Sequence, residues 1–307
     1  MNHYRLFLAI TGCILVSTAA FTQAVKTPSV RYLAEWKEDP EMMRKAGVKE
    51  MREFEVKKTG RVMSGFCTYD KEGYITSEIA YNNGQEIRKL VYEYSLYHHA
   101  WTKYEFFISG KKSTSRRSVC DKNGYETESF FEKPDGSFES ESKTVHYYNK
   151  NNLVDSSIGQ MGIFKYSWHF KYNDAGKMTE VKSKNPFNPD WHWKYTYDST
   201  GRLIYEYWWE VNRKKDSAKV AHSAWEWDTN GRLIKQTGEG RGWKEINCTW
   251  AGDSVVVDMK QGPEFGPPEK HVIWFSPQNG TVTRMRSYNE TGKLESDKWY
   301  EYLFYTQ

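Results

Sequence analysis

The strongest structural signal in the chain is the stretch WHWKYTYDSTGRLIYEYWW, residues 191–209. On both sides of the segment 198–201 the odd positions are aromatic or leucine, and most even positions are polar. Such alternation indicates β-strands, because successive side chains of a strand point to opposite faces of a sheet. The segment 198–201, Asp-Ser-Thr-Gly, contains residues that favour tight turns. The stretch therefore predicts an antiparallel β-hairpin.

The turn of this hairpin recurs along the chain. An Asp or Asn at its first position can accept hydrogen bonds from backbone amides, and a Gly at its fourth position supplies a left-handed residue. The turn-forming pairs are Asp70 and Gly73, Asn173 and Gly176, Asp198 and Gly201, Asp228 and Gly231, and Asn289 and Gly292. From Asn149 the turns step by 24, 25 and 30 residues, and this spacing indicates a repeat architecture. We predict structural roles for these residues, and no catalytic or calcium-binding role.

The hairpin also predicts which residues face each other. An uninterrupted ladder pairs Tyr197 with Leu203 and places all odd-numbered residues on one face. The further predicted pairs are Tyr195 with Tyr205, Trp193 with Tyr207 and Trp191 with Trp209 on that face, and Lys194 with Glu206 and His192 with Trp208 on the other. The odd-numbered aromatics would expose on the order of 1,000 Å², whereas the largest apolar patches of soluble monomers reach roughly 300–600 Å². We therefore expect the odd-numbered face to be core.

These patterns predict an all-β fold, in which antiparallel hairpin repeats over residues 48–307 form a curled or spiralling sheet. A preceding segment, residues 25–47, contains one short helix. Asp39 is a suitable N-cap for this helix, Pro40 fits its first position, and Gly47 ends it.

The N-terminus, residues 1–24, reads as a secretory signal peptide, with Arg5 before an apolar run and small residues at the cleavage site. The segment Ile-Thr-Gly-Cys at 10–13 fits an alternative, the lipobox of bacterial lipoproteins, in which Cys13 is lipidated. Both alternatives predict an exported protein, in the periplasm, at the cell surface or outside the cell. Membrane association is expected only if Cys13 carries a lipid.

Composition excludes some functions. The net charge of +4 is spread along the chain without a basic block, so nucleic acid is not an expected partner. After removal of the signal peptide Cys67, Cys120 and Cys248 remain, which permits one disulfide and one free thiol, or three buried thiols. Their spacing fits no metal site, and we expect neither a metal nor another cofactor.

The motif Tyr-x-Tyr-Asp-x-x-Gly-Arg-Leu at residues 195–203 resembles the YD repeat of the RHS and teneurin families. Residues 225–233 match it with Trp at both aromatic positions. The resemblance implies an exported protein of bacterial type with a spiralling antiparallel sheet and no catalytic residues in the repeats. It also implies contact with carbohydrate or a cell surface. The chain is far shorter than the arrays that build closed shells in that family.

The sequence contains no nucleophile elbow, phosphate-binding glycine loop or H-E-x-x-H segment, so we predict no catalytic residue. His98 and His99 fall in an aromatic run that reads as a strand. Adjacent strand residues point to opposite faces, so the pair is not expected to chelate one metal ion.

The sequence thus favours a non-enzymatic, exported β-repeat protein that binds a polysaccharide or another exported protein. Aromatic rings outside the predicted core could stack on sugars. The candidate ligand-binding residues are Trp208, His192, Lys194, Trp243 and Trp299. The alternatives are a passive structural scaffold or assembly component, and a hydrolase with an unrecognised site.

Overall fold

The computed structural model describes residue 37 and residues 39–184, 190–211, 219–239, 244–262 and 267–306. The predicted signal peptide and Cys13 lie outside these residues. The described part contains one α-helix, α2 (Pro40–Ala46), and a short 3₁₀ helix, η2 (Leu96–His98).

All other regular structure is β. The strands are β1 (Val48–Lys57), β2 (Gly60–Tyr69), β3 (Ile75–Asn82), β4 (Gln85–Tyr94), β5 (Trp101–Ile108), β6 (Lys111–Cys120), β7 (Glu126–Glu132), β8 (Phe138–Tyr148), β9 (Val154–Met161), β10 (Phe164–Tyr172), β11 (Met178–Lys184), β12 (Asp190–Tyr197), β13 (Leu203–Val211), β14 (Lys219–Trp227), β15 (Leu233–Glu239), β16 (Lys244–Ala251), β17 (Ser254–Gln261), β18 (Glu269–Phe275), β19 (Val282–Tyr288) and β20 (Leu294–Phe304). The predictions of an all-β antiparallel hairpin fold and of one short α-helix are confirmed.

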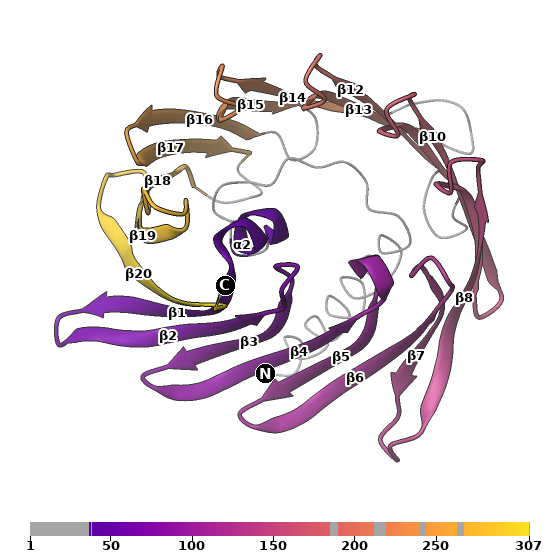
Figure 1. Cartoon of the computed structure of the whole chain (residues 1–307), viewed down its shortest axis with the longest axis horizontal. Coiled ribbons are helices and arrows are strands. Elements are labelled where there is room, and N and C mark those ends of the chain that lie inside the picture. Colours follow the sequence, from indigo (N-terminus) through magenta and orange to yellow (C-terminus); the bar gives the residue numbers. More distant parts are fainter. Residues whose placement is uncertain are drawn as a thin grey trace, which may run out of the picture.

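The sheet closes on itself. Its 20 strands are paired in order, and β1 pairs with β20 as well as with β2, so the ribbon forms a complete ring (Figure 1). The resemblance to YD and RHS repeats, with its curled or spiralling sheet, is therefore wrong for this chain. An open sheet leaves two unpaired edges, whereas the antiparallel pairing of Met51 with Tyr302 and of Glu53 with Tyr300 removes them.

Helix α2 forms where the sequence predicts it. Asp39 Oδ1 accepts hydrogen bonds from the amides of Glu41 and Met42 at 3.0 and 3.2 Å, and Gly47 ends the helix with a φ of 68°. The helix lies inside the ring (Figure 1), with Met43 fully buried. No helix in the described part of the chain is both long and apolar enough to cross a membrane.

The hydrophobic core lines the inner face of the wall and is concentrated at one end of the barrel. Met43 of α2 joins this core, and Val181, Val255 and Ile273 are completely buried in it. We call this end the turn rim. Its turns lie at residues 70–73, 121–124, 149–152, 173–176, 198–201 and 228–231, whereas the turn at 289–292, between β19 and β20, lies at the opposite end.

The register within the hairpins differs from the uninterrupted ladder. Tyr197 does face Leu203, but a bulge between Thr196 and Tyr197 moves every later pair by one residue. Tyr195 therefore faces Glu206, Trp193 faces Trp208, Lys194 faces Tyr207 and His192 faces Trp209. The same bulge in β10–β11 places Val181 rather than Glu180 in the core, because one extra residue reverses the faces of a strand.

The three cysteines are free thiols, so of the two sequence alternatives the one without a disulfide holds. Cys67 and Cys248 are buried, and Cys120 is half-buried. Burial raises the pKa of the Cys67 thiol to about 12 and that of Cys248 to about 11. A thiol reacts through its thiolate, so both are protected chemically as well as sterically.

Thiol labelling checks this arrangement. With iodoacetamide at pH 8, we expect Cys120 to be alkylated first, and Cys67 and Cys248 to react at comparable rates only after denaturation. Peptide mapping by mass spectrometry gives the rate at each site. Rapid native labelling of Cys67, or a disulfide-linked peptide, would contradict the prediction.

Candidate functional site

The turns of the rim are built by their Asp and Asn side chains. In the turn of residues 198–201, Asp198 Oδ1 accepts hydrogen bonds from the amides of Thr200 and Arg202, both at 2.9 Å, and Gly201 has a φ of 81°. Asp198 Oδ2 also accepts from Arg202 Nε at 2.7 Å. Asp70 and Asp228 make the corresponding amide contacts in their own rim turns, and Asn289 makes them in the turn at the opposite end.

Aromatic side chains connect several neighbouring hairpins at the rim. Near the end of a strand, a Tyr hydroxyl or a Trp Nε1 donates a hydrogen bond to the first carbonyl of an earlier strand on the rim. We call these residues aromatic hooks. The hooks are Tyr94 to Ile75, Tyr172 to Val154, Tyr197 to Met178, Trp227 to Leu203, Trp250 to Leu233 and Tyr302 to Val282, with distances of 2.6–2.9 Å. The aromatic residue before the turn is thus both core and connector.

A hollow of about 440 Å³ opens at the turn rim. It is lined by Tyr74, Tyr97, His99, Tyr125, Leu153, Tyr172, Gly176, Lys177, Met178 and Tyr197. Most of these side chains are aromatic, and Lys177 adds a cation whose Nζ lies 5.7 Å from the centroid of the Tyr197 ring. A concave, aromatic surface with a few polar groups has the general character of a small-molecule site.

From the hollow, aromatic side chains continue along the inner wall of β10, β12 and β13. We call this set the aromatic strip: Tyr166, Trp168, Trp191, Trp193 and Trp208, all half-buried. Ring centroids are 5.8 Å apart between Trp168 and Trp193, 5.9 Å between Trp191 and Trp193, and 5.1 Å between Trp191 and Trp208. Tyr197 lies on the same face as Trp191, six residues away, so hollow and strip extend together over about 20 Å.

Small residues on the strands beside these rings let them lie along the wall. A Cβ on Gly159 of β9 would lie only 2.1 Å from the Tyr166 ring. Ser157 of β9 and Ser183 of β11 both pair with Trp168 and are almost completely buried. The Tyr166 hydroxyl is within 2.8 Å of Thr144 Oγ1, which fixes the outer end of that ring.

A carboxyl group borders the strip. Glu206 pairs with Tyr195 and lies two residues from Trp208, on the same face. Burial raises the pKa of Glu206 to about 7, so near neutral pH the group can both donate and accept hydrogen bonds.

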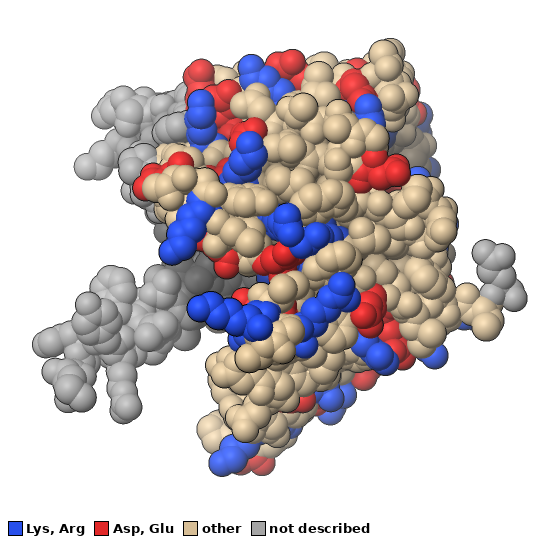
Figure 2. All heavy atoms as spheres, turned by 90° about the vertical axis from the view of Figure 1, so that its left-hand side faces the viewer, with Lys and Arg blue, Asp and Glu red and all other residues tan. Residues whose placement is uncertain are grey.

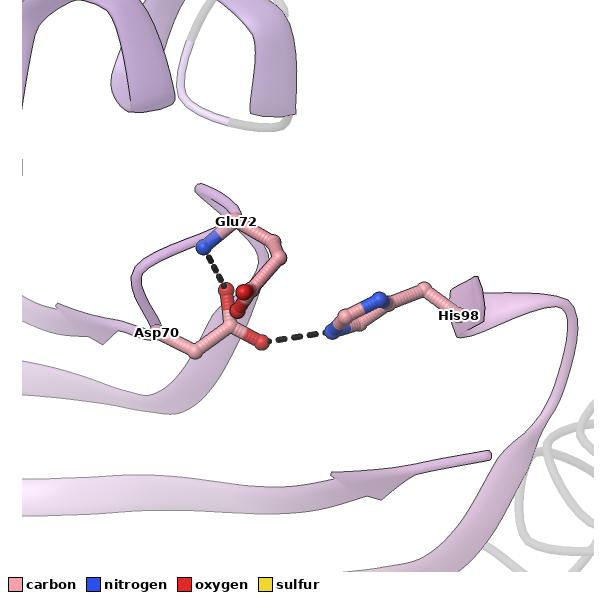
Figure 3. A group of neighbouring side chains, drawn as sticks. All are labelled: Asp70, Glu72 and His98. Carbon is pink, nitrogen blue, oxygen red and sulfur yellow. Dashed lines mark hydrogen bonds and ion pairs between the residues drawn. The ribbon is translucent and has the colours of Figure 1, made fainter. Parts of the chain in front are cut away.

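At the rim Asp70, Glu72 and His98 converge (Figure 3). Asp70 Oδ2 lies 2.7 Å from His98 Nε2, and the His98 ring stacks on Tyr74 at a centroid distance of 4.0 Å. The predicted strand at His98 and His99 is wrong. His98 lies in η2 and His99 follows it, and His99 stacks on Tyr125 rather than on Tyr74.

The structure divides the predicted ligand-binding residues. Trp208 belongs to the aromatic strip, whereas His192 and Lys194 lie on the other face of the sheet, beside Trp209. The His192 and Trp209 rings are 4.7 Å apart, and Lys194 Nζ lies 5.7 Å from the Trp209 ring. The one-residue register shift explains why Trp209, not Trp208, accompanies His192.

Trp299 lies apart from both groups, on β20. The guanidinium groups of Arg61 and Arg284 lie 4.1 and 4.5 Å from its ring centroid, and Arg284 also pairs with Asp297. Trp243 falls outside the described residues.

The residue patterns described above predict neither the convergence of Asp70 with His98 nor the aromatic strip. Asp70 and His98 are 28 residues apart, and their contact depends on the course of η2. The strip had a usable signal, namely the small residues Ser157, Gly159 and Ser183 in strands adjacent to aromatic ones.

Fold and site together define a closed β-barrel with an aromatic inner wall. No protein-family model and no curated protein sequence matches the chain. Among solved structures it is similar to a porin-like protein from Bacteroides uniformis ATCC 8492, with a TM-score of 0.34, 8% identity, and coverage of 83% of this chain and 98% of that one. A porin-like protein from Bacteroides vulgatus ATCC 8482 gives a TM-score of 0.25, 13% identity and coverage of 83% and 99%.

A further similarity is to the TcdB2-TccC3-Cdc42 structure, with a TM-score of 0.21 and 8% identity. It covers 82% of this chain and 20% of that one. Scores this low transfer no function, and the closure of the barrel and the sites described above follow from this chain's own pairing and contacts.

Proposed function

We propose that this protein is an exported, non-enzymatic β-barrel that binds carbohydrate along the hollow and the aromatic strip. The observation that carries the proposal is the contact of Trp168, Trp193, Trp191 and Trp208 in one half-buried row on the inner wall. Such a row suits a chain of sugar rings better than a single small molecule.

The chemistry of the wall favours a sugar. The faces of aromatic rings carry negative potential, which attracts the weakly positive C–H groups on the apolar face of a pyranose. Hydroxyl groups at the edge of the sugar need polar partners, and Glu206 offers both donor and acceptor capacity. Lys177, at the hollow, adds a cation for hydroxyl or carboxylate groups.

A closed barrel is also the form in which β-sheets cross membranes, and in such a barrel the outer wall faces lipid. Lys171 stands between the core-facing Phe170 and Tyr172, and therefore points outward, where it pairs with Glu180 at 2.7 Å. Asp258, between Val257 and Met259, pairs outward with Lys270 at 3.5 Å.

The outer surface seen in Figure 2 likewise carries Lys and Arg beside Asp and Glu. A Lys or Arg facing lipid at the bilayer midplane costs about 2–4 kcal/mol, and Lys194, which faces outward in the middle of β12, would be such a residue. These charges favour a barrel whose outer wall is in contact with water.

A passive scaffold is the second candidate. The closed ring weakens it, because pairing of β1 with β20 removes the free sheet edges through which copies of an open sheet would assemble.

The neighbouring residues Trp208 and Trp209 provide a matched test, because they lie on opposite faces of β13. After a glycan array has identified an oligosaccharide, we expect Trp208→Ala to weaken its binding about 10-fold or more, as truncation of an aromatic anchor commonly does. Trp209→Ala should leave the affinity unchanged. Isothermal titration calorimetry measures both.

Two results would contradict the proposal. If Trp209→Ala, His192→Ala or Lys194→Ala weakens binding while Trp208→Ala does not, the ligand binds on the outer face. If no polysaccharide on the array binds, the scaffold becomes the better explanation.

A further inference from the structure

We propose that Asp70, Glu72 and His98 form a binding site for a divalent transition-metal ion of the Zn²⁺ type. The inference is independent of carbohydrate binding. One ligand atom from each of the three residues lies within 4.8 Å of the others, and the side chains come from two segments, the β2–β3 turn and η2 (Figure 3).

The Asp70 carboxylate is held in place before any ion binds. Its Oδ1 accepts hydrogen bonds from the amides of Glu72 and Tyr74 at 3.0 and 2.9 Å. These contacts belong to the turn itself, so they direct Oδ2 away from the turn and toward His98. Only Oδ2 is then offered to an ion.

The His98 side chain is also held in place before any ion binds. Its ring lies parallel to Tyr74, with an interplanar angle of 8°, and the Tyr94 ring is 5.2 Å away on a tilted plane. The stacked ring presents Nε2 to Asp70 Oδ2. A fixed imidazole next to a fixed carboxylate lowers the ordering cost of coordination.

The neighbouring turn provides an internal comparison. Asp121 Oδ1 likewise accepts from the amides of Asn123 and Tyr125, and His99 stacks on Tyr125 at 4.1 Å. There, however, Asp121 Oδ2 accepts a hydrogen bond from the Tyr148 hydroxyl. The convergence of Asp, Glu and His at Asp70 is thus a property of that turn and does not follow from the repeat.

The donor set determines the class of ion. One imidazole nitrogen and two carboxylate oxygens suit Zn²⁺ and related ions, whereas Ca²⁺ and Mg²⁺ prefer six or more oxygen ligands. Tetrahedral Zn²⁺ holds its ligand atoms about 3.3 Å apart. Asp70 Oδ2 and His98 Nε2 would therefore separate by a few tenths of an ångström, and Nε2 would bind the ion with the hydrogen of the neutral ring on Nδ1.

Calorimetric titration of the tag-free, full chain with ZnCl₂ tests the site. Asp70→Asn is the sharpest variant, because Asn149, Asn173 and Asn289 build the same turn elsewhere in this chain, so the turn should survive. We expect wild-type protein to bind one Zn²⁺ at this site, and Asp70→Asn and His98→Ala to weaken binding at least about 10-fold. His169→Ala, at an exposed histidine elsewhere, should bind as wild type.

Thermal unfolding with and without Zn²⁺ gives a second readout. Zn²⁺ should raise the Tm of wild-type protein and of His169→Ala, but not that of Glu72→Gln or His98→Ala, and CaCl₂ should raise none of them. Equal Zn²⁺ affinity in wild type and His98→Ala, or loss of binding in His169→Ala, would overturn the proposal.

Discussion

Lys298→Met is expected to lower the free energy of unfolding by about 3 kcal/mol at pH 7, measured by urea denaturation. Lys298 on β20 donates to Glu53 Oε1 on β1 at 2.9 Å, and Lys37 also pairs with Glu53, which is only 4% exposed. Removing Lys298 leaves this buried carboxylate with one cation. Because the pair crosses the β1–β20 seam, the loss weakens the pairing that closes the barrel.

The effect should depend on pH in a defined direction. Burial alone would raise the pKa of Glu53, but the charges of Lys37 and Lys298 outweigh it and bring the pKa to about 2. A lowered folded-state pKa contributes stability above the unfolded value, near 4.5, that is lost as the pH falls toward 2. The difference between wild type and Lys298→Met should therefore shrink over that interval.

The matched control is Lys270→Met. Lys270 pairs with Asp258 at 3.5 Å, but both side chains are about half exposed, so the change should cost at most about 1 kcal/mol. Equal losses for the two variants would show that the Glu53 pair contributes no more than a surface pair.

Gly73→Ala is expected to cost about 2–5 kcal/mol and to release α2 from the wall. Gly73 has a φ of 86°, where a side chain adds about 1–2 kcal/mol of strain. Its Cβ would also lie 2.1 Å from the Pro40 carbonyl oxygen and 2.7 Å from the Arg44 amide nitrogen, and such overlap with backbone adds about 1–3 kcal/mol. Denaturation measures the cost, and hydrogen exchange at α2 reports its release.

Gly84→Ala separates backbone strain from overlap with α2 as the cause of the lost stability. Gly84 has a similar φ of 78°, but nothing lies within 4 Å of its Cβ position, so only the strain remains. If both variants lose the same stability and α2 stays protected, contact of the helix with the turn is not what Gly73 maintains.

The local parts of this fold could be predicted from the sequence. Asp39 and Gly47 bracket α2 as their capping chemistry requires, and the turn of residues 198–201 adopts the expected geometry. Each depends on residues only a few positions apart. The resemblance to YD repeats was misleading because turn chemistry alone favours most residues of the motif, whatever fold surrounds the turn.

Two parts of the fold could not be predicted: the closure of the ring, which depends on distant partners, and the register of the hairpin, which depends on a bulge. The residue patterns of β1 and β20 do not indicate that Met51 pairs with Tyr302, so closure of the barrel could not be predicted. The predicted register is correct for Tyr197 and Leu203, but the bulge between Thr196 and Tyr197 shifts every later pair by one residue. The later residues of β13 therefore lie on the opposite face from the predicted one. That single residue moved Trp208 to the inner wall, and with it the most favourable candidate for ligand contact.

The aromatic hooks have a consequence for biosynthesis. Every hook donates toward the N-terminus, to a carbonyl that the ribosome has already delivered, 17 to 24 residues earlier in the chain. Where a hook is present, a new hairpin can therefore attach to the one before it as soon as its own aromatic residue is available. Tyr305 makes a contact of much longer sequence separation: its hydroxyl donates to the carbonyl of Tyr69, 236 residues earlier. This last hydrogen bond joins the C-terminal end of the chain to β2, one of its earliest strands. The ring can therefore close only after synthesis has reached the C-terminal residues.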